Sequence, residues 1–195
     1  MKTTLRLAAL GFALSLTSPA VAQQSAPRGG IGIALSNFDT GSLFTGGFPA
    51  AHVYVPIVIS PGMRIEPELG VLKLEDDQDP SQDVSVYTLG IGLLFTRRVS
   101  EDLLAYVGPR VAVSRVSQPV ADPFGPASVD AVGTDLRIAG AIGGEYFFSP
   151  RFSLGGEAQL AFTSVGDRDV SGVGTIRGGS SIATHALVFF RAYIF

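Results

Sequence analysis

The side chains of this sequence that could carry out catalysis are few. It contains two histidines, His52 and His185, and no cysteine. A serine nucleophile needs a general base within hydrogen-bonding reach, and Ser180 and Ser181 precede His185 by a few residues. No motif supports such a pair, and a histidine at the edge of the surface is the simpler interpretation. The sequence therefore predicts no catalytic residues.

Phosphate and metal sites also lack their signatures. The glycine-rich stretches 41–47 and 172–179 have no Gly-Lys-Ser/Thr, which a phosphate-binding loop requires. The acidic stretch Glu75–Asp83 lacks the central glycine and the terminal glutamate of a calcium loop. We interpret all three as solvated loops, and we predict neither a cofactor nor a bound metal.

The other charged residues follow a pattern with a period of two. In residues 63–74, Arg64, Glu66 and Glu68 alternate with apolar side chains. Successive side chains of a β-strand point to opposite faces, so these three charges share one face of a sheet. The same alternation places five further charges opposite apolar rows: Arg110, Asp135, Arg137, Glu145 and Glu157. The pattern predicts a sheet with one apolar face and one polar face.

Eight segments alternate in this way, joined by connections that are alternately long and short. They lie near residues 30–38, 48–59, 63–74, 84–96, 103–116, 135–148, 152–163 and 186–195. Pro56 is awkward within the second segment, because proline removes a donor from the ladder. The 24 glycines, 12 prolines and short alternating segments favour an all-β fold. After residue 22 no run of 18 apolar residues occurs, which excludes membrane-spanning helices.

The last segment, 186–195, is almost wholly apolar and ends on an aromatic residue. An exposed edge strand of this kind would invite pairing with other chains, whereas a closed barrel in lipid satisfies its backbone on both sides. Its pattern resembles the C-terminal signal of bacterial outer-membrane β-barrels. The residues that carry this resemblance are Leu187, Phe189, Tyr193 and Phe195. It implies that they face lipid and that the barrel-assembly machinery recognises them; Arg191 departs from the pattern, since an outward apolar residue is expected there.

The eight segments together resemble the small eight-stranded barrels of the OmpA and OmpX type. The resemblance implies an all-β, eight-stranded, antiparallel up-and-down transmembrane β-barrel with periplasmic termini and four longer surface loops. It also implies contact with outer-membrane lipid and lipopolysaccharide, handling by the barrel-assembly machinery and periplasmic chaperones, and a monomeric state. The predicted function is structural or interaction-mediating, without enzymatic activity.

Alternation alone does not tell which row faces inward. A lipocalin would enclose a ligand with its apolar row. Small residues in the polar row suit a narrow interior, and aromatics near strand ends, such as Phe95, Tyr146 and Phe152, suit girdles at the membrane interfaces. Both features favour the charged row inside the barrel.

The eight charges of the polar row are therefore predicted to form a network in the lumen. A buried carboxylate costs several kcal/mol unless it is paired, and the signs nearly balance. We expect Arg110 and Arg137, on neighbouring strands, to find partners among Glu66, Glu145 and Glu157. An eight-stranded lumen is just wide enough for its own side chains, which predicts a plugged barrel. A narrow pore is the alternative, and a lipid-modifying enzyme is a weaker one.

The first 22 residues predict a cleaved signal peptide. Lys2 and Arg6 precede the apolar run 7–16, and Ala20-Val21-Ala22 supplies the small-x-small cleavage site. Cleavage would leave residues 23–195 as a single barrel domain in the bacterial outer membrane. That domain has 12 basic and 17 acidic side chains, a balance that argues against binding nucleic acid.

Overall fold

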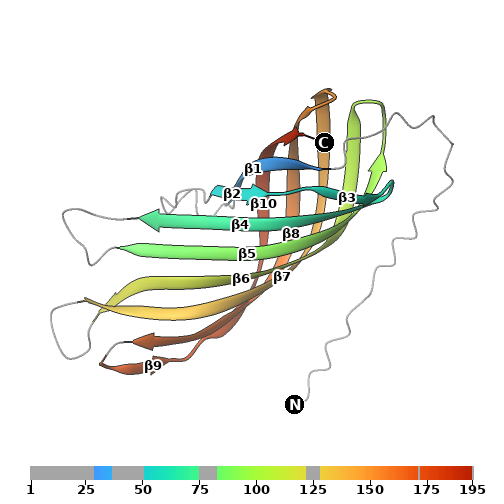
Figure 1. The fold of residues 1–195 in the computed structure, drawn as a ribbon. Coiled ribbons are helices and arrows are strands. Elements are labelled where there is room, and N and C mark those ends of the chain that lie inside the picture. The colour runs from blue at the N-terminus through green and yellow to red at the C-terminus, as the bar shows by residue number, and fades with distance from the viewer. Residues whose placement is uncertain (1–28, 37–50, 75–82, 122–127, 171, 195) are drawn as a thin grey trace, which may run out of the picture.

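The computed structural model describes residues 29–36, 51–74, 83–121, 128–170 and 172–194. The predicted signal peptide, most of the acidic loop and Phe195 lie outside these ranges. All regular structure in the described residues is β-strand, and none of them forms a helix long and apolar enough to cross a bilayer. The strands (Figure 1) are β1 Gly30–Ser36, β2 Ala51–Tyr54, β3 Ile57–Ser60, β4 Met63–Leu74, β5 Val84–Arg98, β6 Leu103–Ala121, β7 Ser128–Ser149, β8 Phe152–Val170, β9 Gly174–Ile176 and β10 Gly179–Tyr193.

Eight of these strands close into a ring. Each pairs antiparallel with its neighbour in the order β1-β2-β4-β5-β6-β7-β8-β10, and β10 also pairs with β1. The closing pairs run from Gly30 opposite Tyr193 to Ser36 opposite Leu187. Closure lets the strands satisfy one another's backbone groups, which a sheet in lipid requires. The prediction of an eight-stranded antiparallel up-and-down barrel is confirmed.

The second predicted segment is divided by Val55 and Pro56 into β2 and β3. Both pieces pair with β4, so together they form one arm of the ring. The Gly30 amide donates to the Pro56 carbonyl at 3.1 Å, and the Val55 amide donates to the Pro67 carbonyl at 3.0 Å. The chain thus passes the proline while keeping hydrogen bonds on both sides.

The sheet continues further on the loop side than the sequence suggests. The predicted segments 103–116 and 135–148 leave a long connection between them, but much of that connection extends β6 and β7, with Pro119 opposite Asp130. Likewise β8 reaches Val170 and carries the short β9 on its edge. Pairing across a hairpin outweighs the low strand propensity of single proline and aspartate residues. In Figure 1 these extensions project together at the left, away from the tight turns.

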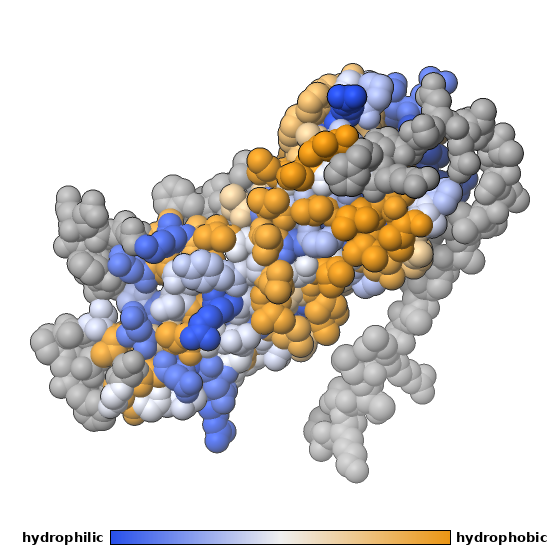
Figure 2. Space-filling model, viewed as in Figure 1, coloured by the Kyte–Doolittle hydropathy of each residue, from blue (hydrophilic) through white to orange (hydrophobic). Residues whose placement is uncertain are grey.

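Three short turns, at 61–62, 99–102 and 150–151, mark what we call the turn end of the barrel; the opposite end is the loop end. Between them, the outward row is apolar. On β4, Leu69 and Val71 are 55% and 58% exposed, whereas Arg64, Glu66 and Glu68 are buried. Figure 2 shows hydrophobic side chains gathered mainly over the middle of the visible face. The apolar row therefore faces outward, unlike that of a lipocalin.

Aromatic side chains bound this apolar band. Phe148, Phe152 and Phe190 pack together near the turn end, with ring centroids 5.8–6.3 Å apart. On β8, Phe162 points outward ten residues beyond Phe152. At about 3.3 Å per residue and a tilt of about 40°, that separation corresponds to roughly 25 Å along the barrel axis. This matches the height of the apolar band in outer-membrane barrels.

The closing strand β10 faces the opposite way from the prediction. Its inward row, at most 5% exposed, consists of Leu187, Phe189, Arg191 and Tyr193. Its outward row contains Val188 and Phe190, which are 50% and 44% exposed, and Ile194 just after the strand is 62% exposed. The prediction that Leu187, Phe189 and Tyr193 face lipid is therefore wrong. Arg191 shares their row, and a guanidinium is more stable beside carboxylates than in a bilayer.

Candidate functional site

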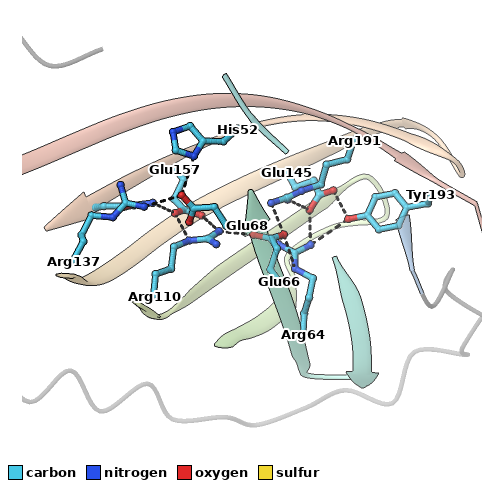
Figure 3. Close-up of polar contacts among 11 residues, drawn as sticks. His52, Arg64, Glu66, Glu68, Arg110, Arg137, Glu145, Glu157, Arg191 and Tyr193 are labelled. Carbon is cyan, nitrogen blue, oxygen red and sulfur yellow. Dashed lines mark hydrogen bonds and ion pairs between the residues drawn. The ribbon is translucent and has the colours of Figure 1, made fainter. Parts of the chain in front are cut away.

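The most distinctive site of this barrel is the set of ionised side chains that cross its interior. Six of them, each at most 4% exposed, come from five strands (Figure 3). They are Arg64 and Glu66 on β4, Arg110 on β6, Glu145 on β7, Glu157 on β8 and Arg191 on β10. Three guanidinium groups thus meet three carboxylates, so the group is electrically neutral as a whole.

Two arginines and two glutamates form a closed ring of ion pairs. Arg64 Nη1 lies 2.9 Å from Glu145 Oε2, and Arg191 Nη1 lies 2.8 Å from the same oxygen. On the other side, Glu66 Oε1 lies 2.6 Å from Arg191 Nη2 and 3.5 Å from Arg64 Nε. Each arginine therefore contacts both glutamates, and the ring joins β4, β7 and β10.

Glu145 is the centre of this ring. Its Oε1 accepts hydrogen bonds from the Tyr193 hydroxyl at 2.5 Å and from the Ser153 hydroxyl at 2.6 Å. Arg64 Nη1 also donates to the Tyr193 hydroxyl at 3.2 Å. The closing strand is thus attached to the interior at two of its residues, Arg191 and Tyr193.

Arg110 connects the ring to β8. Its Nε and Nη2 donate to the two oxygens of Glu157 at 2.7 and 2.6 Å, the bidentate geometry that gives strong and directional pairs. Its Nη2 also contacts Glu66 Oε2. Gln159 donates to Glu157 Oε1 at 2.7 Å. Gly92 lies opposite Arg110, where an added Cβ would be only 2.8 Å from Arg110 Nη1.

Aromatic rings separate and support the guanidinium groups. Arg64 and Arg110 each lie 4.9 Å from a tyrosine ring centroid, that of Tyr106 and that of Tyr54 respectively. Arg191 lies 3.7 Å from the ring centroid of Phe189. Cation–π contacts of this kind are strongest where water is excluded. The inward row therefore combines charges with the rings that pack against them.

Glu68 and Arg137 form a second group nearer the loop end. Arg137 Nη2 lies 2.8 Å from Glu68 Oε1, and His52 Nδ1 lies 2.9 Å from the same oxygen. The Arg137 side chain is 22% exposed, whereas that of Glu68 is buried. Arg110 pairs with Glu66 and Glu157, two of the three glutamates predicted as its partners. Arg137 pairs with Glu68, which is not one of the three.

Asp135 stands apart from both groups. Its carboxylate pairs with Arg168 at 2.8 Å and accepts a hydrogen bond from the Gly166 amide at 3.1 Å. Sequence reasoning did not include Arg168, His52, Ser153 or Arg191 in the network. His52 and Ser153 could have been found by extending the alternation of inward residues along β2 and β8, and Arg191 by its charge in an otherwise apolar segment. Alternation would have placed Arg168 outward, because the β7–β8 register shifts between Gly133 and Asp135 and the inward row of β8 changes from odd-numbered to even-numbered residues.

The contacts of the interior are ion pairs and hydrogen bonds among charged, amide and hydroxyl side chains. His52 pairs with a carboxylate and not with a serine or threonine hydroxyl. Within the described part of the chain, no three histidine, aspartate or glutamate residues are grouped so that they could hold a metal ion. The ion pairs of the central group connect β4, β6, β7, β8 and β10 across the interior.

Comparisons with known proteins give several similar solved structures and one family match. Similar solved structures include Neisserial surface protein A (14% identity, 85% of this chain and 94% of that chain, TM-score 0.49). A second is the N-terminal β-barrel domain of Pseudomonas aeruginosa OprF (12% identity, 84% of this chain and 96% of that chain, TM-score 0.44). A third is Ail, the attachment invasion locus protein of Yersinia pestis (11% identity, 87% of this chain and 99% of that chain, TM-score 0.42). No curated protein matches the sequence significantly. The family described as "Outer membrane protein beta-barrel domain" matches residues 7–195. The chain therefore belongs to this family of bacterial outer-membrane β-barrels.

Proposed function

We propose that this protein is a structural and interaction-mediating barrel whose lumen is closed by its own charged side chains. The observation that carries the proposal is the continuous set of contacts from Glu157 through Arg110 and Glu66 to Arg191 and Glu145. All five residues are at most 4% exposed. Side chains lining a hydrated path would be accessible to water, and an eight-stranded lumen has little room beyond its own side chains.

The loop end supplies the surface for interactions. Beyond Val113 on β6 and Leu136 on β7, both outward and apolar, each strand continues for eight residues. That length corresponds to roughly 26 Å along the strand, so the hairpin extends past the apolar band. In this proposal the protein is a monomer, and its outward row contacts outer-membrane lipid and lipopolysaccharide. The barrel-assembly machinery and periplasmic chaperones act on the chain before insertion.

Conductance across planar lipid bilayers tests the closed lumen. The purified protein is refolded into vesicles, its folded state is verified by a mobility shift between boiled and unboiled gel samples, and the vesicles are fused with the bilayer. We expect no current steps above those of protein-free vesicles. Reproducible steps whose ion selectivity changes in Glu66→Gln would show that ions cross the lumen, and the pore alternative would replace this proposal.

The proposal also assigns no enzymatic role to the barrel, supported by the pairing of His52 with Glu68. Cells with and without the protein should therefore contain lipid A with the same acyl chains, as measured by mass spectrometry. A change in acylation that appears only with the protein would instead support a lipid-modifying enzyme.

A further inference from the structure

From Ala186 to Phe190 the closing strand β10 is apolar on both of its faces. Leu187 and Phe189 point into the barrel, and Val188 and Phe190 point outward. A slip of one residue in strand register exchanges the two faces of a strand. Because the two rows are similar in size and hydrophobicity, burial of apolar surface distinguishes poorly between the two orientations of β10.

Arg191 distinguishes clearly between the two orientations of β10. In the observed register it reaches Glu66 at 2.6 Å and Glu145 at 2.8 Å, both fully buried. A slip of one residue would turn the guanidinium toward lipid and remove a partner from each glutamate. Charged side chains are costly on the lipid face of a barrel, and buried carboxylates are costly without partners.

The strands beside β10 are shaped for the same register. Gly32 of β1 lies opposite Arg191, where an added Cβ would be 2.6 Å from Arg191 Cγ. Gly155 of β8 lies opposite Phe189, and the phenylalanine ring occupies the space of its absent Cβ. Glycine on each side therefore accepts a large inward side chain of β10.

We propose that Arg191 is the register determinant of barrel closure. Its ion pairs with Glu66 and Glu145 select which face of β10 enters the lumen, and thereby how the last strand pairs with β1 and β8. This role concerns the assembly of the barrel and is independent of whether the closed barrel conducts ions or binds a partner.

Tryptophan fluorescence can test this directly, since the chain has no tryptophan of its own. Phe190→Trp and Phe189→Trp provide an outward and an inward reporter, and Ile142→Trp provides a lipid-facing control on β7. Each protein is refolded into vesicles of brominated phosphatidylcholine, which quenches indoles that contact acyl chains. With Arg191 intact, we expect the reporters at 190 and 142 to be quenched and the reporter at 189 to be protected.

Two changes at position 191 then separate charge from packing. In Arg191→Leu, the contrast between the reporters at 189 and 190 should be lost, whereas Arg191→Lys should retain it. Exchanging the two side chains, with Phe190→Arg and Arg191→Phe, should draw residue 190 inward and expose the reporter at 189 to quenching. The control reporter at 142 should remain quenched in every variant.

Retention of the original contrast in Arg191→Leu, or of a protected reporter at 189 in the exchanged protein, would overturn the proposal. Failure of both Arg191→Leu and the exchanged protein to insert, judged by gel mobility, would also overturn it. A register determinant alters how β10 pairs and not whether the barrel closes. Loss of the contrast in Arg137→Leu as well would also overturn it. That result would show that removing any interior arginine disturbs β10.

Discussion

The strands β4 and β10 cross the same barrel but hold their orientation by different means. Along β4, three buried charges alternate with Ile65, Leu69 and Val71 of the outward row. Along residues 186–193 of β10, a single charge lies among residues that are mostly apolar on both faces. Turning β4 over would place three charges in lipid, whereas turning β10 over would place only one there. Three charges thus hold the orientation of β4, whereas one charge, Arg191, and the Tyr193 hydroxyl hold that of β10.

The largest effect should come from breaking the charge balance that β4 provides. In Glu66→Gln, three buried arginines would share two glutamates, and loss of one partner from a buried ion pair typically costs about 3–5 kcal/mol. We expect a decrease of that size in the free energy of unfolding. Urea titration of the barrel in lipid vesicles would measure it.

A second variant checks that charge balance is the cause. Arg64→Met combined with Glu66→Gln leaves two complete pairs, Arg191 with Glu145 and Arg110 with Glu157. Much of the lost stability should then return, because removal of both partners of a buried pair is often nearly neutral. If Glu66→Gln alone changed stability by less than about 1 kcal/mol, the interior would have to be well hydrated.

The outward row of β4 should be the next most sensitive. Leu69 lies near the middle of the apolar band, opposite Leu89 of β5. Leu69→Arg should reduce the free energy of unfolding by about 2–4 kcal/mol, the cost of arginine near the midplane of a bilayer. Thr88→Ser, a change on the inward row that keeps a hydroxyl near Ser114, serves as the control. Equal effects of the two variants would contradict the assignment of the faces.

The sequence predicts the fold and most of the lumen because both depend on alternation. The strands β4, β6 and β7 each have one row that is clearly polar and one that is clearly apolar, so their inward residues were identified correctly. In β10 the two rows are both apolar, and the resemblance to a C-terminal signal favoured the wrong face. Only Arg191, treated as a departure from the pattern, carried the information on orientation.

Pairing within the lumen lies beyond what alternation can provide. Arg137 is on β7, yet its partner Glu68 is on β4, across the barrel and not on a neighbouring strand. Such contacts depend on the stagger of the strands and on how far each side chain reaches, and one sequence specifies neither quantity directly. The same holds for Glu145, whose partners come from three strands.

The smallest expected effect concerns the end of β4 that approaches the loops, where Glu68 meets Arg137. Unlike the central ring, this pair is partly open to water, since the Arg137 side chain is 22% exposed, and Glu68 keeps His52 as a second partner. Its strength should therefore lie between that of exposed and that of buried ion pairs, about 1–2 kcal/mol. A double-mutant cycle of Arg137→Met and Glu68→Gln, read by urea unfolding in vesicles, measures this coupling.

The same cycle with Arg137→Met and Glu157→Gln should give a value near zero, because those two side chains share no contact in the described residues. A coupling energy to Glu157 as large as that to Glu68 would mean that Arg137 interacts with all the interior carboxylates alike. The distinction between the central ring and the loop end of β4 would then no longer hold.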